Sequence, residues 1–141
     1  MTHRAIGIVR AATGVFAALL AVVSLLPAGR GPGGWDSHIH PALQNSLHVP
    51  SYAILLVGLA MSVAPGRRSA GGALLLAAVL SAAYGGVLEA FQAFVPGRTA
   101  AVDDALLNVA GIALAMPVAW WLTRRLLARQ AAELEQAKRP T

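Results

Sequence analysis

Four apolar segments of membrane-spanning length constrain this chain more than any other feature of its sequence. They cover residues 6–26, 47–64, 70–95 and 101–123. A helix needs about 20 mainly apolar residues to cross the hydrocarbon core of a bilayer. Charged residues make up 12% of the chain, whereas soluble domains carry about 25%. The sequence therefore predicts an all-α membrane protein, a bundle of four transmembrane helices that forms a single domain over residues 1–141.

Prolines mark where these helices should end or bend. Pro65 follows the second segment and Pro96 follows the third. Pro117 lies well inside the fourth segment, where it predicts a kink of the kind that membrane helices tolerate. We expect residues 124–141 to form a cytoplasmic tail, which can continue the fourth helix.

Two rows of small residues predict close helix contacts. Such rows, with a small residue at every fourth position, let helix backbones approach one another in lipid. The rows are Ala82, Gly86 and Ala90 on the third segment, and Gly111 and Ala115 on the fourth.

The distribution of basic residues predicts the orientation of the chain. Cytoplasmic loops of membrane proteins carry an excess of Lys and Arg. Of the 11 Lys and Arg residues, Arg30 and Arg98 fall in the first and third loops, and the others lie at the N-terminus, in the second loop or in the C-terminal tail. We therefore expect a multi-pass protein of the bacterial inner (cytoplasmic) membrane, with both termini cytoplasmic. A cleaved signal peptide over residues 1–28 is the alternative for the first segment.

Composition excludes several classes of function. The chain has no cysteine, so disulfides and thiolate chemistry are excluded. Its net charge of +5 does not indicate a nucleic-acid partner, because the basic residues flank hydrophobic segments instead of forming a soluble basic patch. No nucleophile motif or phosphate-binding glycine loop is present, and we expect no cofactor. The expected surroundings are the lipid bilayer.

Rare polar side chains gather at the predicted outer ends of the last three segments. Glu89 and Gln92 share one helix face, as do Asp104 and Asn108. Ionisable groups at membrane depth usually face the bundle interior and mark functional sites. The sequence therefore predicts an outward-facing polar pocket that binds a ligand through His48, Tyr52, Glu89, Gln92, Arg98, Asp104 and Asn108.

A purely structural role is the first alternative for these residues. Arg98 would pair with Asp104 or Glu89, and Asn108 would hydrogen-bond Gln92. Such a clasp locks two helices together without binding anything. Seven polar side chains on three helices exceed what a clasp needs, and we therefore prefer the pocket.

Chemical roles are the second alternative. Glu89, His48 and Asp104 are the candidate catalytic residues, because a partly buried carboxyl group and an imidazole can act as general acid and base. The same three side chains also offer the donor atoms of a mixed metal site, as do His38 and His40 in the first loop. Nothing in the spacing demands a metal, and we predict none.

The polar pattern resembles the hallmark of the VanZ-like family of small bacterial membrane proteins. The resemblance covers about residues 44–121, and its most specific part reads Glu89-x-x-Gln92, Phe94, Pro96-Gly97-Arg98 and Asp104-x-x-x-Asn108-x-x-Gly111. His48-x-x-x-Tyr52, followed by Gly58, is similar to the family's other motif. The chain departs from the pattern at Gln44 and Asn45, where the family often has Asp-Lys, and at Ala115, where a glycine is common.

The resemblance implies an integral membrane protein of the cell envelope. The founding member of the family is associated with low-level resistance to the glycopeptide teicoplanin. We expect the pocket to bind an anionic lipid headgroup or a cell-wall (peptidoglycan) precursor, with Arg98 contacting its phosphate or carboxylate. A membrane enzyme that performs acid–base chemistry on an envelope lipid is one alternative. An accessory subunit that binds a membrane protein partner in a larger complex is the other.

Overall fold

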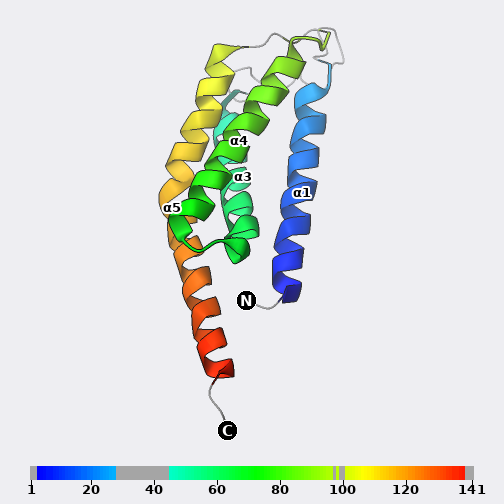
Figure 1. Ribbon diagram of the computed structural model, residues 1–141. Helices are drawn as coiled ribbons and strands as arrows, with labels where there is room; N and C mark the ends of the chain where they lie inside the picture. Colours follow the sequence, from blue (N-terminus) through cyan, green and yellow to red (C-terminus); the bar gives the residue numbers. More distant parts are fainter. Residues whose placement is uncertain (1–2, 28–44, 97, 99–100, 139–141) are drawn as a thin grey trace.

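The regular elements of the protein are helices throughout the part of the chain that the computed structural model describes, which is residues 3–27, 45–96, 98 and 101–138 (Figure 1). Three helices are long and apolar enough to cross a membrane, and a fourth is apolar but has 16 residues. The prediction of an all-helical membrane protein is therefore confirmed. The elements are α1 (His3–Leu25), α3 (His48–Val63), the short 3-10 helix η1 (Ala64–Gly66), α4 (Ala70–Gln92) and α5 (Val102–Ala137).

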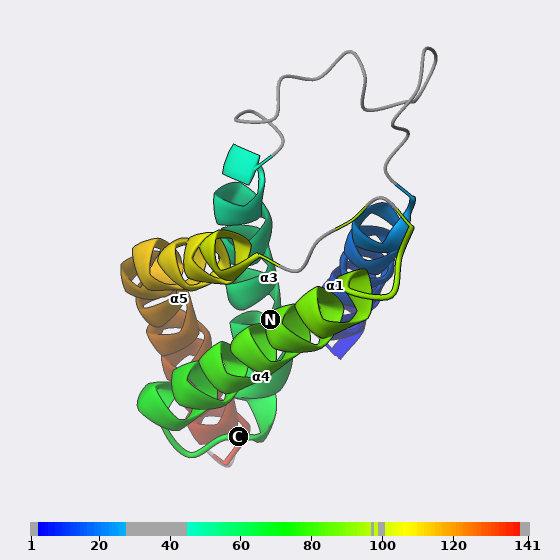
Figure 2. The same ribbon diagram turned by 90° about the horizontal axis from the view of Figure 1, so that it is seen from above.

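The short helix α3 is the centre of the bundle. It contacts α1, α4 and α5, and its contact with α5 is the most extensive. Seen along the bundle, α1 and α5 lie on opposite sides of α3 (Figure 2). The start of α1 and the end of α5 lie at the same end of the bundle, while α3 and α5 both begin at the other end (Figure 1). The polar residues predicted to form a pocket belong to that second end.

Helix α4 ends at Gln92, sooner than the predicted end at residue 95. Proline disfavours helical backbone in the residue that precedes it, so Pro96 prevents the helix from continuing through Val95. The backbone instead forms tight turns, with the N–H groups of Phe94 and Val95 donating to the carbonyls three residues earlier at 3.0 Å. Glu89 therefore lies less than one turn from the end of α4, much closer than the expected helix implied.

Helix α5 does not stop where its membrane-spanning segment ends. It runs for 36 residues to Ala137, so the predicted tail continues the helix. Leu126 is buried against Ala64 and Ala73, and the residues that follow are mostly strong helix formers. Pro117 lies inside the helix, which changes direction midway between its yellow and red ends (Figures 1 and 2).

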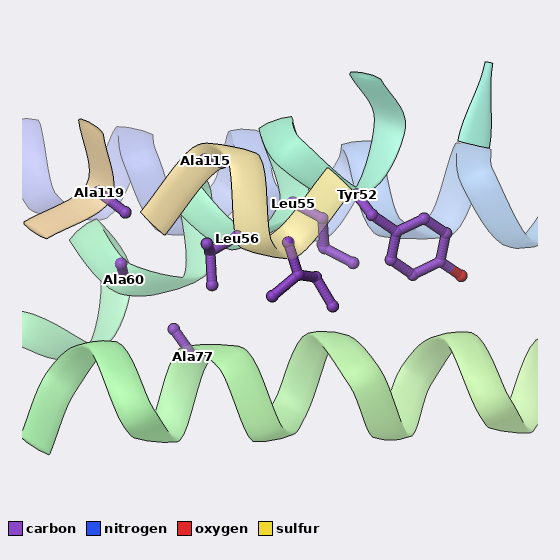
Figure 3. Packing of buried hydrophobic residues seen from close by; sticks show 8 residues of the cluster. Tyr52, Leu55, Leu56, Ala60, Ala77, Ala115 and Ala119 are labelled. Atoms are coloured by element: carbon purple, nitrogen blue, oxygen red, sulfur yellow. The ribbon is translucent and has the colours of Figure 1, made fainter. Parts of the chain in front are cut away.

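Large side chains of α3 insert between small residues of its neighbours. Tyr52, Leu55 and Leu56 are almost completely buried, and they pack with Ala77 of α4 and Ala115 of α5 (Figure 3). Lipid tails are as apolar as leucine, so helix association in a bilayer depends on van der Waals packing of this kind. The alanines allow α4 and α5 to approach α3 closely enough for that packing.

Glycines set the closest approaches between helices. A Cβ atom on Gly111 would meet the backbone carbonyl of Val49, and a Cβ atom on Gly85 would lie 2.9 Å from the Tyr52 ring. The predicted row that contains Gly111 therefore does lie where α5 closely approaches α3. The row that contains Gly86 does not mark a close approach, because its residues are exposed and a Cβ on Gly86 meets nothing within 4 Å. Gly85, one position earlier, makes the contact instead.

Replacing Gly111 with Leu should destabilise the bundle, because the new side chain collides with the rigid carbonyl of Val49. Overpacking of this kind costs about 1–3 kcal/mol. The thermal midpoint of the purified protein in detergent measures the effect. Gly86→Leu is the matched control and should leave the midpoint nearly unchanged. Equal midpoints for the two variants would show that the α3–α5 approach does not need a glycine.

Candidate functional site

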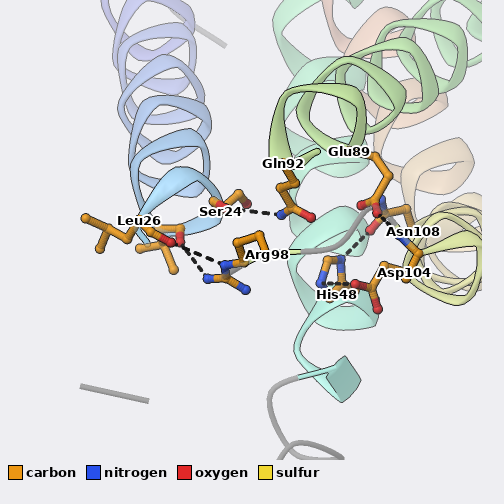
Figure 4. Close-up of polar contacts among 10 residues, drawn as sticks. Ser24, Leu26, His48, Glu89, Gln92, Arg98, Asp104 and Asn108 are labelled. Atoms are coloured by element: carbon orange, nitrogen blue, oxygen red, sulfur yellow. Dashed lines mark hydrogen bonds and ion pairs between the residues drawn. The ribbon is translucent and has the colours of Figure 1, made fainter. Parts of the chain in front are cut away.

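His48, Asn108 and Asp104 form the centre of the polar cluster. His48 is the first residue of α3, and the other two lie in the first two turns of α5. The Nδ1 atom of His48 is 2.8 Å from Oδ1 of Asn108, so Nδ1 carries the proton when the amide oxygen accepts. The other ring nitrogen, Nε2, faces Asp104 Oδ2 at 3.9 Å (Figure 4). The hydrogen bond to Asn108 orients the imidazole, and Asp104 forms an ion pair with the ring only when both ring nitrogens are protonated.

The site is largely but not fully enclosed. The exposed fractions of the His48 and Asp104 side chains are 20% and 15%, and Asn108 is buried. The second carboxylate oxygen of Asp104, Oδ1, is buried and has no hydrogen-bond partner among the described residues. Buried polar atoms are nearly always hydrogen-bonded in folded proteins. An acceptor without a donor therefore indicates where a ligand or water would bind.

Tyr52 and Gly85 lie together at the inner side of the cluster. Tyr52 is one turn below His48 on α3 and is 2% exposed. A Cβ atom on Gly85 would lie within 3.1 Å of both the Tyr52 hydroxyl and the amide nitrogen of Asn108. Because Gly85 has no side chain, the Tyr52 hydroxyl and the Asn108 amide can occupy their positions without a steric clash. The sequence pattern places Gly85 on the same helix face as Glu89 and Gln92, but Gly85 was not among the predicted site residues.

Glu89 joins the end of α4 to the start of α5. Its Oε1 atom accepts a hydrogen bond from the backbone N–H of Ala101, the residue that caps α5 (Figure 4). Ala101 has no side-chain oxygen to cap the helix, and the first N–H groups of a helix need acceptors. The carboxylate of Glu89 supplies one, and its charge is favourable near the positive end of the helix dipole.

Gln92 and Arg98 hold the end of α1. The Nε2 atom of Gln92 donates to the carbonyl of Ser24 at 3.2 Å. Arg98 donates from Nε to the carbonyl of Leu26 at 3.2 Å and from Nη2 to that of Val23 at 3.4 Å (Figure 4). The last carbonyls of a helix lack intrahelical donors, and a guanidinium fork can satisfy two of them. Both side chains therefore connect the α4–α5 region to α1.

The predicted clasp has different partners from those expected. Arg98 donates to the end of α1 instead of pairing with Asp104 or Glu89. Asn108 bonds His48 instead of Gln92. The seven predicted residues thus divide into two groups, one around His48 and Asp104 and one at the end of α1.

Of the two metal sites considered, the structure tests the one formed by His48, Glu89 and Asp104. Among the described residues, no group of three or more His, Asp, Glu or Cys side chains is placed to hold a metal ion. His48, Glu89 and Asp104 therefore do not form the mixed site, because Glu89 turns toward the start of α5. His38 and His40 lie outside the described residues.

A family model described as VanZ/LLP1 matches residues 10–124. The chain belongs to the VanZ/LLP1 family. The matched segment includes all seven predicted site residues, the whole of α3 and α4, α1 from residue 10 and α5 as far as residue 124. No curated protein and no solved structure matches the chain. Family membership and three helices able to span a bilayer together identify a membrane protein.

The cluster of this VanZ/LLP1 protein contains groups that can accept hydrogen bonds. Asp104 offers a carboxylate oxygen without a partner among the described residues, and the adjacent imidazole can donate or accept. Hydroxyl and amine groups fit such a site. An imidazole oriented by an amide and lying beside a carboxylate also has the geometry of a general base.

Replacing Arg98 with Leu should loosen the end of α1, because two of its last carbonyls lose their donor. Hydrogen bonds to charged groups contribute about 1.5–3 kcal/mol, and we expect a loss of unfolding free energy in that range. Amide hydrogen exchange should rise at residues 23–27. Adding Asp104→Leu should not restore stability, since the two side chains are not paired. Arg68→Leu, at an exposed position, is the control. Restored stability in the double variant would revive the ion-pair clasp.

Proposed function

We propose that this protein is a cell-envelope protein of the bacterial inner membrane that binds the polar head of an envelope lipid or cell-wall precursor. Its binding site is the cluster of His48, Tyr52, Asp104 and Asn108, and it opens to the extracytoplasmic face. The observation that carries the proposal is the buried Asp104 oxygen without a partner among the described residues. Ionisable groups at membrane depth are costly and usually serve a function.

The proposed orientation has four spans and both termini in the cytoplasm. The excess of Lys and Arg near the termini and before α4 supports it, as does the common end of the bundle at which α1 starts and α5 finishes (Figure 1). Helix α3 has 16 residues, about 24 Å of helix, which is shorter than a hydrocarbon core of about 30 Å. Local thinning of the bilayer accommodates short spans at modest cost.

The ligand's chemistry follows from the groups that would meet it. Asp104 would accept from a hydroxyl or amine, as carried by sugars, glycerol and amino sugars. Arg98 belongs to the neighbouring group at the end of α1, and its half-exposed side chain extends toward Leu26, away from His48 (Figure 4). It would contact a phosphate or carboxylate of the same ligand at the rim, in addition to holding α1. Lipid-linked precursors of the cell wall combine both kinds of group.

Reporter fusions test the orientation. A cytoplasm-specific reporter should be active when fused after Arg68 or at the C-terminus, and a reporter that works outside the membrane should be active when fused near Gly33. The reason is the uneven distribution of basic residues. An extracytoplasmic C-terminus would overturn the orientation and place the site on the wrong side for an envelope precursor.

Binding of a labelled lipid-linked cell-wall precursor to the full chain in lipid nanodiscs tests the site. Asp104→Asn should weaken binding by about tenfold or more, because a hydrogen bond to a charged group contributes about 1.5–3 kcal/mol. His48→Gln should weaken it as well. Asp103→Asn is the matched control, since Asp103 is the exposed neighbour in the same turn. Equal affinities for the Asp103 and Asp104 variants would refute the proposed site.

An enzyme is the second candidate, favoured by the orientation of the His48 ring between Asn108 and Asp104. In that case His48 and Asp104 would transfer a proton during breakdown of the bound lipid. The same nanodiscs separate the two functions. Product formation that His48→Gln removes while binding persists supports the enzyme. Binding with no product over long incubation supports the binding protein. If the chain does not bind the labelled precursor but co-purifies with another membrane protein, the role of accessory subunit replaces both the binding function and the enzymatic function.

A further inference from the structure

An apolar groove of about 720 Å³ lies between α1 and α5, with α3 as its floor. Helices α1 and α5 flank α3 without contacting each other in the described part of the chain. The groove is therefore on the side of α3 that faces away from α4. Its lining includes Thr13 and Phe16 of α1, Ile54 and Val57 of α3, and Leu114 and Val118 of α5.

The groove offers contacts to hydrocarbon and little else. Its one hydroxyl, on Thr13, already donates to the carbonyl of Val9 at 2.8 Å. Ile54, Leu114 and Val118 point outward with more than half of their surface exposed. The volume falls within the range of about 300–1,000 Å³ that is usual for small-molecule sites. A flexible acyl chain fits such a surface.

The α5 wall of the groove leads to a stacked arginine. Leu114, Val118, Trp121 and Arg125 follow one another at steps of four, three and four, and therefore share one face of the helix. The Arg125 guanidinium lies 3.9 Å from the centre of the Trp121 ring. Tryptophan is typical of the membrane–water interface, and Arg125 is seven residues beyond Val118, about 10 Å along the helix. The groove thus ends at a cation at headgroup level.

The neighbouring arginine has a different position. Arg124 also lies over a tryptophan, Trp120, at 5.8 Å. Trp120 faces α4, since a Cβ atom on Gly71 would lie 3.7 Å from its ring. Arg124 and Arg125 therefore have the same charge and similar depth, but only the face of Arg125 continues from the groove.

We propose that the groove and Arg125 together bind one anionic glycerophospholipid of the surrounding bilayer. One acyl chain lies in the groove over α3, and the phosphate contacts Arg125 beside Trp121. Charge complementarity selects this occupant, because basic residues at the membrane surface attract anionic headgroups. The site is separate from the cluster around His48, which lies at the opposite end of the bundle, and it does not depend on the function proposed for that cluster.

Native mass spectrometry of the full chain, with phosphatidylglycerol or phosphatidylcholine added in detergent, tests the charged half of the site. One phosphatidylglycerol should remain bound in preference to phosphatidylcholine. Arg125→Gln should reduce that binding about fivefold, as expected for one basic side chain near a membrane surface. Arg124→Gln should leave it unchanged. Equal losses in the two variants, or no preference for phosphatidylglycerol, would overturn the proposal.

Filling the groove tests its apolar half. Val118→Trp should displace the bound phosphatidylglycerol, whereas Val79→Trp on the free face of α4 should not. The two valines are matched, with exposed fractions of 54% and 55%. Circular dichroism and the thermal midpoint verify that both variants fold. Lipid retention in a folded Val118→Trp variant would overturn the proposal. So would a dimer of the parent chain that Val118→Trp dissociates, because the groove would then be an interface between copies.

Discussion

The site at the end of the bundle where α3 and α5 begin depends on one backbone contact between these two helices. Gly111 allows the carbonyl of Val49 to approach so closely that a Cβ atom has no room. Val49 follows His48, and Asn108 lies one turn before Gly111 on the same face of α5. The contact therefore fixes the separation at which the imidazole and the amide meet at 2.8 Å. In lipid, where apolar side chains gain nothing by leaving their surroundings, such close backbone packing is what holds two helices in register.

Much of the fold was predictable because its signals are local. Apolar length, flanking charge and proline positions identify the membrane helices without reference to other parts of the chain. The end of α4 shows where that logic is incomplete, since the helix stops at Gln92, earlier than the position of Pro96 implies. The continuation of α5 beyond residue 123 was anticipated from the sequence, whereas the burial of Leu126 against Ala73 is a tertiary contact that no local pattern predicts.

The site was predicted as a set of residues but not as a set of contacts. Spacing along a helix correctly places Asp104 and Asn108 on one face, and both interact with His48. A long flexible side chain such as Arg98 can reach several acceptors, and sequence offers carboxylates as the obvious ones. Backbone carbonyls are invisible in a sequence pattern because every residue has one. Here Arg98 and Gln92 donate to carbonyls at the end of α1 instead of pairing with the carboxylates or with Asn108.

Donors to backbone carbonyls have a special importance for α1, which buries very little of its surface. Arg10 donates to the carbonyl of Ser62 at the end of α3 at 3.1 Å, and Tyr84 donates to that of Ala17 at 2.5 Å. Together with Gln92 and Arg98, these bonds tie α1 to the bundle at its C-terminal end and at two positions within the helix, Arg10 and Ala17. Because water is absent from the hydrocarbon core, a side chain there that donates to a carbonyl, as Tyr84 does, satisfies a hydrogen-bonding group that water cannot reach. A few directed bonds can therefore hold a helix that is otherwise surrounded by lipid, and they leave the space beside it open as the groove over α3.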